Sequence, residues 1–150
     1  MQLALATTVN GTFAETVART RAALAEQGFG VLTEIDMKAT LKAKLDADME
    51  DYLILGACNP PLAHRAVGEL RQIGLLLPCN VVVRSDAARE GTVIVEAMNP
   101  ALMVEVTDDP DRPVTSESRP RGRSRGSSVS PGVMRVASLK ATDTSVPRPA

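Results

Sequence analysis

The sequence feature that most constrains the fold is an apolar run, Tyr52–Cys58, which a helix signal follows directly. The run shows no alternation between apolar and polar residues, which is typical of a strand covered on both faces near the middle of a sheet. Asn59 then suits the N-cap of a helix, and Pro60 and Pro61 are tolerated in a first helical turn. We therefore predict a buried strand that leads straight into a helix.

Capping signals mark two earlier helices. Thr12 and Glu15 form a capping box, and the helix that they start is expected to run to about Gln27, where Gly28 supplies a left-handed residue. Asp36 is placed to cap a second, shorter helix. The apolar stripe predicted for the first helix consists of Phe13, Val17 and Leu24, with Ala14, Ala18 and Ala25 beside them.

The remaining short apolar segments predict strands over residues 2–8, 29–35 and 92–97, and a further buried stretch over residues 74–83. The order of elements is then β-α-β-α-β-α-β-β, with the last two strands as antiparallel neighbours. This order predicts one layered α+β domain with a mixed sheet. A short helical turn is expected over residues 99–103.

The composition changes at Asp108. Proline, serine, arginine and glycine without periodicity fill residues 108–150, and such a segment cannot bury enough apolar surface to offset its ordering entropy. Residues 1–105 carry 9 Lys and Arg against 13 Asp and Glu, whereas residues 106–150 carry 8 against 5. We predict a domain over residues 1–107 and a disordered tail over 108–150. The tail is either genuine or the product of a reading-frame change that replaced a C-terminal helix.

Composition also restricts location and partners. Neither a secretory signal nor an apolar stretch of 18 residues is present, so we expect a cytoplasmic protein without a membrane span, in which cysteines stay reduced. The folded domain has only three aromatic residues, Phe13, Phe29 and Tyr52, which disfavours base stacking and therefore nucleic-acid binding.

Three segments carry a resemblance to a known family: residues 27–36 (QGFGVLTEID), 55–66 (LGACNPPLAHRA) and 73–81 (IGLLLPCNV). In them the chain resembles the bacterial family called domain of unknown function 302 (DUF302), over about residues 1–109. The resemblance implies a small α+β domain that forms homodimers, and it brings no established reaction.

Two cysteines and one histidine are the candidates for chemistry. Cys58 precedes a helix N-terminus, which favours a thiolate, although most free cysteines are simply small buried apolar residues. His64 lies in the helix after Cys58, and Cys58, His64 and Cys79 together offer soft ligands for zinc or copper(I). Their spacing matches no established zinc pattern, and His64 also fits a surface position.

These residues define the candidate site and three functions. The predicted ligand-binding residues are Cys58, Asn59, Pro60, His64, Cys79 and Asn80. The first hypothesis is a homodimeric module that binds a small ligand or a metal ion there. The alternatives are a thiol-dependent enzyme that uses Cys58, and a purely structural or interaction domain. The sequence identifies no cofactor.

Overall fold

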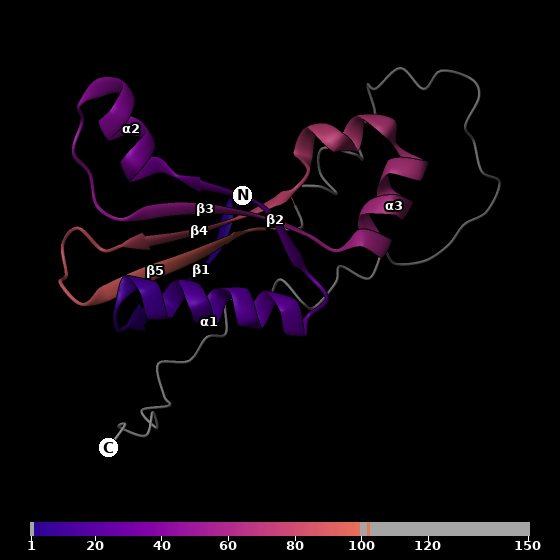
Figure 1. Ribbon diagram of the computed structural model, residues 1–150. Helices are drawn as coiled ribbons and strands as arrows, with labels where there is room; N and C mark the ends of the chain where they lie inside the picture. Colours follow the sequence, from indigo (N-terminus) through magenta and orange to yellow (C-terminus); the bar gives the residue numbers. More distant parts are fainter. Residues whose placement is uncertain (1, 100–101, 103–150) are drawn as a thin grey trace.

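The computed structural model describes residues 2–99 and residue 102. Its elements are, in order, β1 (Ala4–Asn10), α1 (Phe13–Glu26), β2 (Gly30–Asp36), α2 (Met37–Leu45), β3 (Tyr52–Cys58), α3 (Pro60–Glu69), the 3-10 helix η1 (Arg71–Leu76), β4 (Cys79–Ser85) and β5 (Thr92–Met98) (Figure 1). The predicted tail, residues 108–150, lies outside the described residues, as does most of the predicted turn over 99–103. No helix in the described part is both long enough and apolar enough to cross a bilayer.

The five strands form one sheet in the order β1-β5-β4-β3-β2, and every neighbouring pair is antiparallel. The α+β class is confirmed, but the predicted mixed sheet is wrong. A parallel pair needs a crossover between neighbouring strands. Here α2 and α3 connect antiparallel neighbours at opposite ends of the sheet, and only α1 crosses, from one edge strand to the other (Figure 1).

The capping box of α1 is present as predicted, but the buried stripe differs. Thr12 accepts a hydrogen bond from the Glu15 backbone N–H, and the Glu15 carboxylate accepts one from the Thr12 backbone N–H. Thr16 and Thr20 are fully buried beside Leu24, whereas the predicted flanking residues Ala14, Ala18 and Ala25 are exposed.

The hydroxyls of these buried threonines explain the difference. Thr16 donates to the Thr12 carbonyl at 2.9 Å, and Thr20 donates to the Thr16 carbonyl at 2.8 Å. Because each hydroxyl is satisfied inside the helix, the methyl groups pack on the sheet at no polar cost.

Only one face of the sheet is covered along its length. Helix α1 packs against β2, β4 and β5 on this face, and the fully buried core gathers there. The inward residues of the three inner strands are Leu53, Leu55, Ala57, Val81, Val83, Val93, Val95 and Ala97, all at most 6% exposed.

The residues between them point to the other side of the sheet, which we call the open face. It carries Tyr52 and Ile54 from β3, Val82 and Arg84 from β4, Ile94, Glu96 and Met98 from β5, and Ile35 from β2. These side chains are half-buried, and Ile35 is the most exposed of them at 45%. The strand predicted to be covered on both faces is covered along its length on the α1 side. On the open face it is covered where Thr33 and Pro78 lie over Gly56 and where α2 packs at one end.

The predicted buried stretch over residues 74–83 divides into two elements. Its first part belongs to η1, where Leu75 is 87% exposed, and only the part after Pro78 forms a strand. The glycine in this segment breaks strand regularity, and Pro78, which lacks an N–H, stands immediately before β4.

Candidate functional site

Four of the six predicted ligand residues meet at one end of the sheet, where β3 ends and β4 begins. In the antiparallel register Ala57 lies opposite Cys79, and Gly56 lies opposite Asn80. Cys58 and Asn59 follow directly along the chain. The register therefore places these four residues at the same end of the sheet.

The two thiols at this end differ in environment. Cys79 shares the inner side of the sheet with Ala57, and the alternation of β3 turns Cys58 to the opposite side. Both cysteines are free and partly buried. Burial raises the pKa of the Cys79 thiol, and the neighbouring charge of Cys58 raises it further. Cys79 is therefore a neutral thiol at pH 7, which makes it a poor nucleophile.

Asn59 and Pro60 have structural roles at the start of α3. The Asn59 side-chain oxygen accepts a hydrogen bond from the Leu62 backbone N–H at 3.2 Å, as predicted for an N-cap. Its amide nitrogen lies against Gly28, whose φ of +79° confirms the predicted left-handed end of α1. Pro60 is the first residue of α3 and is exposed.

The predicted metal ligands do not form a group. His64 is exposed on α3. Within residues 2–99 no three His, Cys, Asp or Glu side chains are close enough together to hold a metal ion. The trio Cys58, His64 and Cys79 is therefore not assembled as a metal site in this structure.

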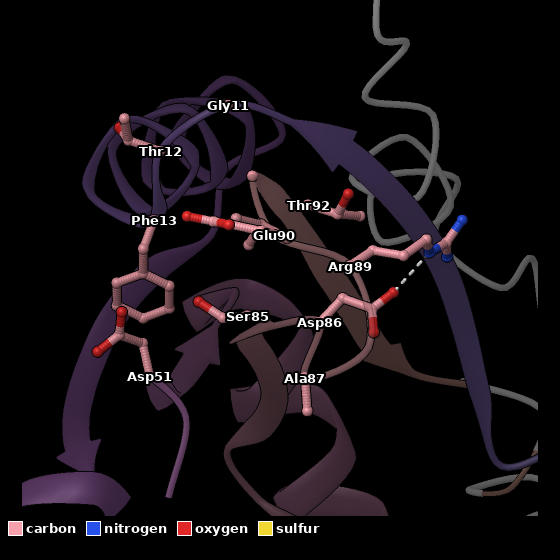
Figure 2. A pocket seen from close by; sticks show the side chains of 12 residues that line it. Gly11, Thr12, Phe13, Asp51, Ser85, Asp86, Ala87, Arg89, Glu90 and Thr92 are labelled. Atoms are coloured by element: carbon pink, nitrogen blue, oxygen red, sulfur yellow. Dashed lines mark hydrogen bonds and ion pairs between the residues drawn. The ribbon is translucent and has the colours of Figure 1, made fainter.

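A hollow of about 500 Å³ lies at the opposite end of the sheet (Figure 2). The start of α1, the residue before β3 and the connection from β4 to β5 enclose it. Its lining residues are Gly11, Thr12, Phe13, Asp51, Ser85, Asp86, Ala87, Arg89, Glu90, Gly91, Thr92 and Val93. Asp51 in its lining precedes Cys58 by seven steps along β3, a span of about 23 Å at the usual rise of a strand.

The charges in the hollow are partly neutralised by neighbours. Arg89 donates from Nε to the Asp86 carboxylate at 2.9 Å, and Lys38 of α2 lies 2.9 Å from the Asp51 carboxylate. A hydrogen bond from the Ala88 backbone N–H lowers the pKa of Asp86, and the hydrogen bond from Arg89 lowers it further. The hydrogen bond to Asp51 raises the pKa of Lys38. Glu90 has no ion-pair partner among the described residues. Sequence reasoning missed this hollow because its residues belong to ordinary turns.

The open face contains a second feature that the sequence did not indicate. Arg84 of β4 donates from Nε to Glu96 of β5 at 2.9 Å, and from a terminal nitrogen to the other carboxylate oxygen at 3.4 Å. The two side chains are 28% and 29% exposed and lie diagonally across two neighbouring strands. The available signal was a single charged residue in each of two neighbouring strands, Arg84 in β4 and Glu96 in β5.

Comparison with known proteins gives a family and a fold. The family model described as "Domain of unknown function DUF302" matches residues 5–121. The chain is also similar to an uncharacterized conserved DUF302 protein from Bacillus stearothermophilus, known from its crystal structure. That similarity has 30% sequence identity and a TM-score of 0.65, and it covers 73% of this chain and 84% of the other. Among curated proteins, none matches the chain.

Proposed function

The chain belongs to the family described as domain of unknown function DUF302, and from its geometry we propose that it works as a homodimeric binding module. The observation that carries this proposal is the open face. Ile54, Val82 and Ile94 lie at its centre and are partly exposed, while their sequence neighbours on the α1 side are buried.

The residue types on this face also indicate that another surface buries it. The run Tyr52–Cys58 is apolar on both faces, as in a strand that is buried on both sides, and Val82 and Ile94 add apolar side chains to the open face. Among the described elements, α2 packs above β2 and β3 at one end of this face. Exposed apolar patches of this kind mark association surfaces, and in soluble proteins the commonest association is a two-fold dimer.

The experiment that tests this function replaces one apolar residue of the open face by a charged one. We expect Ile94→Lys to shift the full chain from dimer to monomer in sedimentation velocity, because a lysine there would have to be desolvated in the interface. Leu3→Lys is the matched control, since Leu3 is 73% exposed before β1 and lies outside the open face.

Circular dichroism checks that each variant folds. If Ile94→Lys does not fold, Ile35→Lys takes its place, because Ile35 is 45% exposed on the same face. A wild-type chain that sediments as a monomer contradicts the proposal, and so does an Ile94→Lys or Ile35→Lys variant that folds and dimerises like the control.

A second candidate function is the binding of a small ligand, and the hollow at the start of α1 favours it. Ligand sites are concave, and 500 Å³ lies in their usual range of about 300–1,000 Å³. The lining combines the Phe13 ring with the unpaired Glu90 carboxylate, a combination that suits a small organic cation. Thermal-shift measurements with a panel of alkyl amines test this, with Glu90→Gln expected to remove the shift and Glu69→Gln of α3 to retain it.

The other functions predicted from the sequence remain predictions. A thiol-dependent enzyme would require Cys58. The Cys58→Ala variant would then lose the activity and keep the oligomeric state of the wild type. Zinc or copper(I) binding would require Cys58, His64 and Cys79 to move together.

A further inference from the structure

We propose that a second copy of this chain docks with its open face against the open face of the first. The two copies are related by a two-fold axis, so that Arg84 of each chain pairs with Glu96 of the other. This inference rests on the proposed homodimer and adds to it the interface and the residues that select the partner. It starts from one ion pair in an apolar setting.

Arg84 and Glu96 lie at the centre of the open face. Across the sheet Arg84 lies opposite Tyr52 on one side and Ile94 on the other, and Glu96 lies opposite Val82 and Ala6. The two charges therefore occupy one diagonal of a four-residue block whose other diagonal is Val82 and Ile94. Any sheet or helix that covers the face must cover this ion pair.

Covering an ion pair removes it from water, which is unfavourable unless further polar partners replace the solvent. The internal contact uses two of the five N–H donors of Arg84, and each carboxylate oxygen of Glu96 retains lone pairs. The hydrogen bond with Glu96 raises the pKa of Arg84, which favours the charged guanidinium. A suitable partner must therefore present one acceptor and one donor at matching positions.

A second copy of the same chain meets this requirement by symmetry. In a two-fold interface, if residue i contacts the partner's residue j, then j contacts the partner's i. A two-fold axis that passes between Arg84 and Glu96 places each arginine over the partner's carboxylate. The four charges then alternate in sign around a closed ring with zero net charge, and Val82 and Ile94 pack beside it. An acidic or a basic partner would leave one of the two charges unpaired.

The test uses two single charge reversals in the full-length chain. In Arg84→Glu the dimer would bring residue 84 against the partner's Glu96, so like charges meet twice, and Glu96→Arg does the same with two arginines. We expect each variant to weaken its own dimer by about a hundredfold or more, as for close charge pairs in other interfaces. Arg19→Glu and Glu26→Arg, on α1 at the other side of the sheet, are the matched controls and should dimerise like wild type.

Mixing the two variants separates the interface from the internal ion pair. Each single variant has like charges within its own chain, so a purely internal role predicts no recovery on mixing. Between one chain of each kind, both contacts across the interface again join opposite charges. We therefore expect a one-to-one heterodimer in native mass spectrometry, which distinguishes the variants by mass, whereas each alone is monomeric.

The outcomes separate the two proposals. A wild-type monomer refutes the homodimer and with it this interface. A wild-type dimer whose single reversals both fold and dimerise normally refutes the interface alone, as does a mixture that stays monomeric. If a single variant does not fold by circular dichroism, the double reversal Arg84→Glu with Glu96→Arg, which keeps both kinds of contact, must dimerise for the proposal to hold.

Discussion

Replacing Gly56 by alanine tests why a glycine interrupts the apolar run of β3. A Cβ atom at this position would lie 2.0 Å from the Thr33 Oγ1 atom and 2.7 Å from the Pro78 Cγ atom. Both distances are well below van der Waals contact, and β2 and the segment before β4 hold the two neighbours in place. Gly56 thus allows Thr33 and Pro78 to close over β3.

The expected cost follows from these two contacts. Overpacking in a well-packed region costs about 1–3 kcal/mol, and two contacts against backbone-anchored groups place Gly56→Ala near the upper end. Alanine in a strand regains about 0.5–1 kcal/mol relative to glycine, because the unfolded chain is less flexible. We therefore expect the free energy of unfolding, measured by urea denaturation at 25 °C, to fall by about 2 kcal/mol.

A double-mutant cycle with Thr33→Ala sharpens the test. This second change removes the Oγ1 atom and leaves the Thr33 Cβ atom at 3.4 Å, although the contact with Pro78 remains. Gly56→Ala should then cost about 1 kcal/mol less in the Thr33→Ala background than in wild type. Gly68→Ala in α3 is the control, since nothing lies within 4 Å of its added Cβ. Equal costs in both backgrounds, or no cost in either, would refute the packing argument.

The remaining predictions concern the cap of α1 and the buried thiol. Thr12→Ala removes the side-chain acceptor for the Glu15 N–H and should lower the free energy of unfolding by about 1 kcal/mol in urea denaturation. Hydrogen bonds from Thr12 lower the pKa of Glu15, so its contribution to stability is present above the ordinary carboxyl range and is lost as the pH falls through the lowered value. In the Thr12→Ala variant the free energy of unfolding should therefore fall less than in wild type as the pH is lowered. An equal fall in both proteins would contradict this. Burial raises the pKa of Cys79, so its contribution is present below the ordinary thiol pKa and lost as the pH rises through the raised value. Mass-spectrometric alkylation should accordingly modify native Cys79 more slowly than the unfolded chain at pH 8, and equal rates would count against its burial.

Much of the fold follows from local signals. The boundaries of β3 coincide with the apolar run, and Thr12, Asp36 and Asn59 each accept the hydrogen bond that their N-cap positions require. Gly28 has the positive φ that the end of α1 needs. These features depend on a few neighbouring residues, so one sequence is sufficient to predict them.

The failures concern relations between distant parts of the chain. Nothing local shows that α2 and α3 join antiparallel neighbours, so the order of elements alone suggested a mixed sheet. Thr16 and Thr20 are polar residues in composition, yet they bury their methyl groups because their hydroxyls bond within the helix. The predicted site residues do gather at one strand end, but Asn59 is a helix cap there, and the hollow lies at the other end of the sheet.

The most direct test of the central claim is the molar mass of the full-length chain in solution, measured by light scattering over a concentration series. We expect a mass twice the 15.9 kDa of one chain, which falls toward that value only on dilution. A mass of one chain at every concentration, with no aggregation, would show that the open face needs no second copy and would contradict the account.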